Sequence, residues 1–146
     1  MDPSSPEARW CLAQYYEELN VLFEEGFDEA NSVVADPGEF CPPRGVFLVA
    51  RIEGQVVGCA AVKLTTKGVG YIKRMWVDSS RRGMGLGRHM LQALEDAAAD
   101  LGCNVVQLET HRSLTGAIKL YESSGYRAVA PFNDEYYAHH WFAKNI

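Results

Sequence analysis

Apolar and polar positions recur with two different periods along the chain, and each change of period marks the boundary of an element. Between Ala8 and Phe27, apolar side chains return every three to four residues, which is the spacing of one helical face. The residues on that face are Leu12, Tyr15, Tyr16, Leu19, Leu22, Phe23 and Phe27. Gly26 is expected to divide the pattern into two helical pieces.

The pattern then changes to runs of β-branched and aromatic residues after a loop at Asp36–Gly45 that is dense in proline and glycine. The predicted strands are 46–51, 56–64 and 71–77, joined by turns at Glu53-Gly54 and Lys67–Gly70. These strands follow one another antiparallel. The central one carries small residues, Gly58, Ala60 and Ala61, where another element must pack closely.

Helical spacing returns at Leu86–Leu101 and is followed by Gly102, a C-terminal cap signal. The remaining predicted elements are a strand at 105–110, a helix at 115–122, and closing strands at 126–129 and 139–143 around a loop at 131–134. A strand reached through a helix implies parallel pairing. The pattern therefore predicts an α+β fold with a mixed, mostly antiparallel central sheet flanked by helices.

Composition narrows the class of protein. The 146 residues fit one domain spanning 1–146, and 47% hydrophobic with 23% charged residues is typical of a globular protein. The net charge of −5 argues against a nucleic-acid partner. We find no apolar run of about 20 residues for a membrane span and no secretion signal, so a cytoplasmic location is expected.

The four cysteines, Cys11, Cys41, Cys59 and Cys103, are widely scattered. Neither a Cys-x-x-Cys pair nor a zinc-finger spacing of His and Cys occurs, so no metal site is expected and reduced thiols are favoured.

The candidate chemistry centres on the glycine-rich segment Arg81–Arg88, which connects the strand 71–77 to the helix 86–101. A strand-to-helix turn of this kind leaves the first N–H groups of a helix free for an anion. Glycines let the backbone approach a ligand closely, and the neighbouring arginines suit a pyrophosphate.

Three phosphate-binding motifs are candidates for this turn. A P-loop requires Gly-Lys followed by Ser or Thr, whereas Gly87 is followed by Arg88-His89. A dinucleotide fingerprint requires a third glycine, but Arg88 or Met90 occupies that position. It also requires an acidic residue at the end of the following strand, roughly where Glu109 lies, and a parallel sheet, whereas three antiparallel strands precede this turn. The third motif, Arg/Gln-x-x-Gly-x-Gly/Ala, is met by Arg82-Gly83-Met84-Gly85-Leu86-Gly87.

With this third motif the sequence resembles the GCN5-related N-acetyltransferase (GNAT) family. A second motif supports the resemblance, since Ala117-x-x-Leu120-Tyr121-x-x-x-Gly125-Tyr126 is similar to the family's Ala-x-x-Leu-Tyr-x-x-x-Gly-Phe ending. The two motifs are joined by a helix and a strand, and the resemblance covers about residues 46–129.

Two departures from the family pattern stand out. The chain starts almost at its first helix, so the usual first strand is either absent or belongs to a longer chain. Where many members carry an asparagine, this chain has Leu114, so a polar contact is either lost or supplied by Ser113 or Thr115.

The resemblance implies binding of acetyl-CoA. Backbone groups of Met75, Trp76 and Val77 would pair with the pantetheine arm and polarise the thioester carbonyl. The pyrophosphate would lie on the backbone N–H groups of the turn. The implied cofactor-binding residues of the turn are Arg82, Gly83, Met84, Gly85, Leu86, Gly87 and Arg88.

The resemblance also implies that Tyr121 is the general acid, since a phenol can protonate the departing thiolate. Glu109, at the end of its strand and twelve residues before Tyr121, is the favoured general base, acting directly or through a water. Four alternative bases remain open: His111, Glu135, His139 and His140. His139 and His140 are adjacent on a strand, so at most one of them can face the site.

The acceptor pocket is expected between the first two helices and the 131–140 loop. Glu24, Glu25, Asp28 and Glu29 could attract a cationic amine there, although a solvated helix face is the favoured explanation of these residues. The aromatic tail, with Tyr136, Tyr137, Trp141 and Phe142, fits either a pocket wall or a homodimer interface.

Two functional hypotheses follow. The first is an acetyl-CoA-dependent N-acetyltransferase acting on the primary amine of a small molecule or amino acid. The second is a non-catalytic CoA-binding sensor or interaction domain of the same fold. A protein N-acetyltransferase is a variant of the first that requires an open groove for a peptide.

Overall fold

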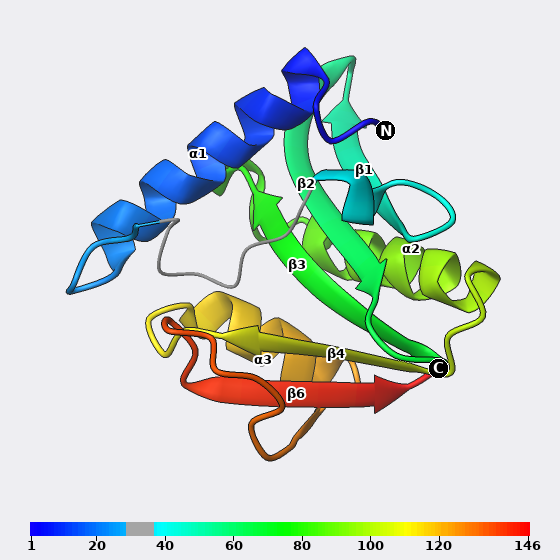
Figure 1. Ribbon diagram of the computed structural model, residues 1–146. Coiled ribbons are helices and arrows are strands. Elements are labelled where there is room, and N and C mark those ends of the chain that lie inside the picture. Colours follow the sequence, from blue (N-terminus) through cyan, green and yellow to red (C-terminus); the bar gives the residue numbers. More distant parts are fainter. Residues whose placement is uncertain (29–36) are drawn as a thin grey trace.

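The computed structural model describes residues 1–28 and 37–146, which form one six-stranded sheet with helices on both faces (Figure 1). The helical elements are α1 (Pro6–Leu22), η2 (Pro37–Phe40), η3 (Ser79–Arg81), α2 (Leu86–Asp100) and α3 (Thr115–Ser123). The strands are β1 (Gly45–Ile52), β2 (Gln55–Leu64), β3 (Val69–Val77), β4 (Val105–Thr110), β5 (Arg127–Ala128) and β6 (His140–Asn145).

The sheet order is β1-β2-β3-β4-β6-β5, and β3–β4 is its parallel pair. The predicted mixed α+β fold is therefore confirmed, as is the parallel pairing through a crossover helix. In the described part of the chain the first strand comes after α1, so the usual opening strand is missing there.

The hairpin β1–β2 forms where the sequence predicts it, because Glu53 and Gly54 both adopt positive φ angles, 52° and 82°. Two consecutive residues with positive φ make the tight turn whose twist matches the strands it joins.

The first helix is shorter than its apolar pattern. α1 begins at Pro6 after the N-cap Ser5, whose side chain accepts a hydrogen bond from Ala8 N, and it ends at Leu22. Gly26 has a φ of 72°, and Phe23 and Phe27 lie beyond the helix. The predicted second helical piece is not formed between Phe23 and Asp28, and residues 29–36 lie outside the described residues.

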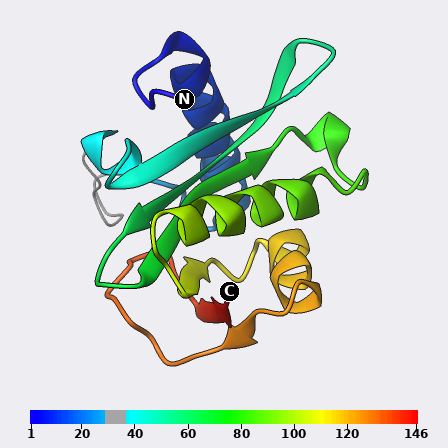
Figure 2. The ribbon, with the colours of Figure 1, turned by 90° about the vertical axis from the view of Figure 1, so that its right-hand side faces the viewer.

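α1 and the pair α2–α3 cover opposite faces of the sheet, as Figure 2 shows. Side chains of β2 point alternately to the two faces of the sheet. Cys59 and Ala61 pack in the hydrophobic cluster on the α1 face, and Ala60 and Val62 pack in the cluster on the α2–α3 face. Gly58 is required here, since an added Cβ would lie 2.7 Å from Trp76 O and 3.1 Å from Met90 Sδ. No helix in the described ranges is long and apolar enough to cross a bilayer.

Candidate active site

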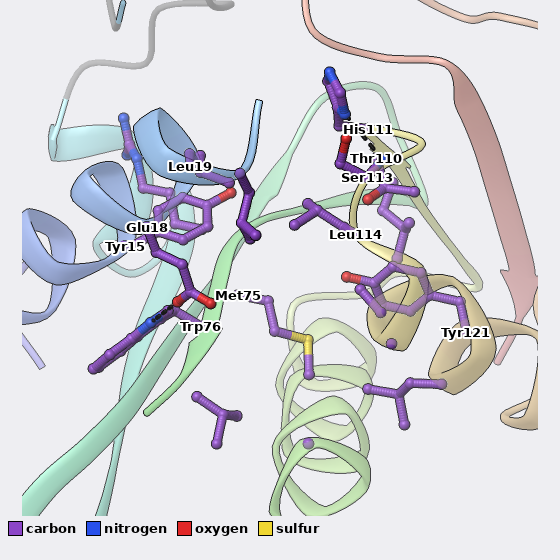
Figure 3. A pocket seen from close by; sticks show the side chains of 18 of the residues that line it. Tyr15, Glu18, Leu19, Met75, Trp76, Thr110, His111, Ser113, Leu114 and Tyr121 are labelled. Atoms are coloured by element: carbon purple, nitrogen blue, oxygen red, sulfur yellow. Dashed lines mark hydrogen bonds between the residues drawn. The ribbon is translucent and has the colours of Figure 1, made fainter. Parts of the chain in front are cut away.

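β3 and β4 separate after a short stretch of pairing, and a cavity lies where they separate. Their parallel register covers only Val69–Tyr71 against Val105–Gln107. From there the two strands diverge, as Figure 1 shows. A cavity of about 670 Å³ lies along this gap and is lined by β3, β4, α1, α3 and the glycine-rich turn (Figure 3).

A β-bulge deforms β3 beside the cavity. Cys59 pairs with Trp76 and Ala61 with Lys73, so Arg74 and Met75 together oppose Ala60. Arg74 has a φ of 56°, which is unusual for a non-glycine residue. Its guanidinium is fixed on the α1 side, where Nε donates to the Tyr16 hydroxyl at 3.0 Å and the group lies over the Phe40 ring.

The three β3 residues predicted to meet the pantetheine arm, Met75, Trp76 and Val77, all line the cavity. The Trp76 ring itself turns to α1, where its Nε1 donates to Glu18 Oε2 at 2.7 Å. Because β3 is paired with β4 only as far as Tyr71, the later edge of β3 faces the cavity without a strand partner in the described residues. An edge of this kind offers backbone N–H and C=O groups to an extended ligand.

The glycine turn has the geometry of an anion site. Gly83 and Gly85 have φ angles of 82° and 81°, and a Cβ added to either would meet nothing within 4 Å. Gly85 is the N-cap of α2 and provides no side-chain cap, so the first N–H groups of the helix are left for another acceptor. The open backbone and the positive end of the helix dipole fit a pyrophosphate.

Gly87 has a different role. A Cβ added there would lie 3.0 Å from Leu120 Cδ2, so this glycine permits the close approach of α3 to the start of α2. Met84 is 60% exposed and is the one predicted turn residue that does not line the cavity.

The two arginines predicted at the turn are held by neighbouring groups. Arg82 Nη2 lies 2.5 Å from Glu18 Oε1, and Arg82 Nε donates to Val77 O at 3.0 Å. Arg88 reaches the end of α3, where its guanidinium donates to Ser123 Oγ at 2.9 Å. Both arginines line the cavity.

Tyr121 lies on α3 at the α2–α3 face of the sheet, and Figure 3 shows its hydroxyl directed into the space between α3 and β3. Burial, and secondarily the nearby Glu109 carboxylate, raises the pKa of Tyr121 well above its usual value. The phenol is therefore fully protonated at neutral pH, which is the form that an acid requires.

Glu109 lines the same cavity from the opposite face of the sheet. Val106 and Leu108 pack in the α2–α3 cluster, so alternation along β4 turns Glu109 toward α1. Glu109 Oε1 accepts a hydrogen bond from the Tyr71 hydroxyl, and Oε2 is buried without a hydrogen-bond partner in the described structure. Burial raises the pKa of Glu109, against the hydrogen bond from Tyr71 and the charge of Lys73.

Sequence reasoning missed the network that supports Glu109. Asn133 Nδ2 donates to the Tyr71 oxygen at 3.1 Å, and Asn133 Oδ1 accepts from Trp141 Nε1 at 3.0 Å. Two-residue alternation could have placed Tyr71 on the α1 face. The contribution of the 131–134 loop depends on tertiary contacts.

The four alternative bases differ in whether they line the cavity. His111 and Glu135 are buried and line the cavity, whereas His139 and His140 do not. Both ring nitrogens of His111 are engaged, with Nδ1 accepting from Ser113 N and Nε2 lying 3.0 Å from Glu25 Oε1. A histidine bonded on both sides has no lone pair ready for a substrate proton. Glu109 and Glu135 are the better-placed candidates.

Of the acidic residues expected to attract the amine, Glu24, Glu25 and Asp28 lie outside the cavity lining. Glu24 is 3.8 Å from Arg112, Glu25 bonds His111, and Asp28 N donates to the Tyr137 hydroxyl. The side chains of Glu24 and Glu25 and the backbone of Asp28 thus serve contacts between the residues at and after the end of α1 and those around His111 and Tyr137. Glu29 lies outside the described residues.

The aromatic tail contributes to the cavity through Tyr137, while Tyr136 is 62% exposed. Leu114 also lines the cavity and packs with Phe23 and Tyr137, so an apolar side chain replaces the family's asparagine there. Ser113 and Thr115, the two polar neighbours considered for that contact, line the cavity as well.

Comparison with known proteins supports an acetyltransferase. Residues 12–126 match the sequence model described as the Acetyltransferase (GNAT) family. An IAA acetyltransferase of Azospirillum brasilense is 34% identical over 123 residues, covering 84% of this chain and 80% of the relative.

Solved structures share the fold. A GNAT-family acetyltransferase of Staphylococcus aureus matches with a TM-score of 0.78 at 17% identity, covering 97% of this chain and 94% of that one. A GNAT-family acetyltransferase of Elizabethkingia anophelis, solved with acetyl-CoA bound, matches with a TM-score of 0.60 at 17% identity. It covers 70% of this chain and 77% of that one.

Proposed function

Because the chain belongs to the acetyltransferase (GNAT) family, we propose that it transfers an acetyl group to the primary amine of a small molecule or amino acid. The donor is acetyl-CoA. One observation carries the proposal: Glu109 and Tyr121 line the same cavity from opposite faces of the sheet, beside the open edge of β3.

The donor end of the cavity is the glycine turn and the β3 edge. The pyrophosphate binds the backbone N–H groups from Gly83 to Arg88, with charge from Arg82. The pantetheine arm lies along Met75–Val77, where backbone N–H groups polarise the thioester carbonyl. The open space above Gly83 and Gly85 supports this assignment.

Transfer proceeds by direct attack. The amine must lose a proton to become a nucleophile, and Glu109 accepts that proton directly or through a water. A raised pKa makes Glu109 a stronger base than an exposed carboxylate, which supports its role. The amine nitrogen forms a bond with the thioester carbon and the carbon–sulfur bond breaks. Tyr121 donates its proton to the departing thiolate from the other face of the sheet, and the proton that the acylated nitrogen gives up restores the phenol.

The test combines two measurements on the wild-type chain. Release of free thiol from acetyl-CoA is followed across primary amines, amino acids and peptides, and thermal stability is measured with CoA alone. Stabilisation by CoA together with acetylation of a small amine is the expected result. Acetylation of peptides alone would instead identify a protein N-acetyltransferase, and stabilisation without turnover on any acceptor would favour the non-catalytic hypothesis.

Glu109→Gln tests the base within the same assay. Glutamine keeps an oxygen that can accept the Tyr71 hydrogen bond but cannot accept the amine's proton. We expect kcat/KM to fall by about 10²-fold with acetyl-CoA binding retained. Full activity in this variant would move the role of base to Glu135.

A further inference from the structure

Six rings form a wall at the α1 end of the cavity, from Tyr15, Tyr16, Phe23, Phe27, His111 and Tyr137. The Tyr16 and Phe27 rings stack at 5.4 Å, the Phe27 and Tyr137 rings lie 4.8 Å apart, and Phe23 stacks on His111 at 3.7 Å. The rings therefore make a continuous surface that comes from α1, the residues after α1, the end of β4 and the tail.

Polar contacts hold this aromatic wall in place. The Tyr137 hydroxyl accepts from Asp28 N at 2.6 Å, and Phe27 N donates to Asn20 Oδ1 at 3.0 Å. The Tyr16 hydroxyl accepts a hydrogen bond from Arg74 Nε. Since the hydroxyls of Tyr16 and Tyr137 serve the protein itself, the wall presents mainly apolar ring surface to a ligand.

Charge divides the cavity into two ends. Three arginines of the cavity lining, Arg81, Arg82 and Arg88, belong to the glycine turn. The carboxylates of Glu109 and Glu135 line the acceptor side, and the charge of Lys73 acts on both of them. Arg74 also lines the cavity, with its Nε bonded to the Tyr16 hydroxyl, so the two carboxylates are balanced by two cations. Glu109 and Glu135 are nevertheless the carboxylates with which an ammonium group can pair close to the aromatic wall.

From the aromatic wall and the two carboxylates beside it, we propose that the acceptor is a primary amine carried on an aromatic body, an arylalkylamine. The inference rests on the proposed function and specifies its acceptor. The ammonium group approaches Glu109 and Glu135, and the body of the acceptor lies against the rings of Phe27 and Tyr137. Ring faces attract a cation and an apolar body together, which a purely aliphatic lining does not.

A strongly hydrated amine fits this end of the cavity poorly. An amino sugar or a polyamine would give up hydrogen bonds to water, and the aromatic wall offers few replacements. The same wall therefore discriminates between primary amines of equal basicity.

The test compares kcat/KM for 2-phenylethylamine, ethanolamine and spermidine at fixed acetyl-CoA. We expect 2-phenylethylamine to be preferred by at least about tenfold, the value of one or two ring contacts. Phe27→Leu, which keeps apolar volume but removes the ring, should lower kcat/KM for 2-phenylethylamine by about fivefold with KM for acetyl-CoA unchanged. Val21→Ala, at a side chain 78% exposed on α1, is the matched control and should change neither value.

The outcomes distinguish failure of the proposed acceptor class from failure of the proposed function. A higher kcat/KM for ethanolamine or spermidine overturns the arylalkylamine acceptor and leaves the N-acetyltransferase intact. Failure to acetylate any amine overturns the proposed function and this acceptor class with it. The wild-type comparison decides these outcomes even where Phe27→Leu folds poorly.

Discussion

Tyr71 donates its hydroxyl hydrogen to one carboxylate oxygen of Glu109, across the parallel strands β3 and β4. Tyr71 faces Gln107 in the register, so its ring reaches diagonally to the residue two positions further along β4. The bond is made at the last paired position before the strands separate. It therefore orients Glu109 beside the point where the two strands begin to diverge.

Tyr71→Phe is expected to shift the pH dependence of acetyl transfer. The hydrogen bond from Tyr71 favours the charged carboxylate and opposes the rise that burial causes, so its loss raises the pKa of Glu109 further. A base must be deprotonated to act, and the acidic limb of the kcat/KM profile should therefore move to higher pH. Activity falls most in acidic buffer and recovers in alkaline buffer.

Tyr136→Phe is the matched control for this measurement, because the Tyr136 ring is 62% exposed and does not line the cavity. The pH profile of this control should coincide with that of the wild type. An unshifted profile in Tyr71→Phe would mean that Glu109 is not the group titrating in the acidic limb.

Tyr121→Phe should lower kcat by about 10²-fold, because the thiolate then leaves without its proton donor. Calorimetry should give an unchanged affinity for CoA. The control is Tyr126→Phe, which removes another buried hydroxyl, one that donates to Glu95 at 2.9 Å and lies outside the cavity lining. Tyr126→Phe should cost about 1 kcal/mol of stability and leave kcat intact. Equal kcat in the two variants would remove Tyr121 as the acid.

Periodicity predicted most of the fold because most elements here bury one face. The helix after the glycine turn was predicted as 86–101 and is observed as Leu86–Asp100. The strand 105–110 was predicted at its observed bounds. The first helix is shorter than its apolar pattern predicts, because Phe23 and Phe27 continue the apolar spacing but belong to the aromatic wall. Strand β5, Arg127–Ala128, is shorter than the predicted strand 126–129. Strand β6, His140–Asn145, begins and ends later than the predicted strand 139–143.

The candidate site was predictable where its chemistry lies in backbone geometry. Gly83 and Gly85 mark the turn by residue type alone, and Glu109 and Tyr121 follow from the resemblance. The partners of Glu109 were not predictable, because Asn133 reaches Tyr71 from a loop 62 residues away in sequence. The contact between Arg82 and Glu18 was not predictable either, because the two residues lie 64 positions apart in sequence.

Gly85→Val should abolish CoA binding. The substitution places a branched side chain at a φ of 81° in the open space above the helix start, where the pyrophosphate is proposed to bind. Gly54→Val is a close control, since Gly54 has a φ of 82° and equally open surroundings at the tip of the β1–β2 hairpin. Both variants carry about 1–2 kcal/mol of backbone strain. Calorimetry that found CoA affinity retained in Gly85→Val would disprove the pyrophosphate assignment.

Glu18→Gln should strengthen binding of acetyl-CoA. The Glu18 carboxylate lies 2.5 Å from Arg82 and adds negative charge beside the turn where the phosphates are proposed to bind, so neutralising it makes Arg82 more available to them. Glutamine still offers an oxygen to Trp76 Nε1, which donates to Glu18 at 2.7 Å. We expect the dissociation constant for CoA to fall by about two- to fivefold at low salt, the range of a partly exposed ion pair, and the gain to shrink as salt is added. Glu7→Gln breaks the exposed pair between Glu7 and Arg51 and should leave CoA affinity unchanged. Weaker binding in Glu18→Gln would show instead that Glu18 holds Arg82 in the orientation that CoA requires.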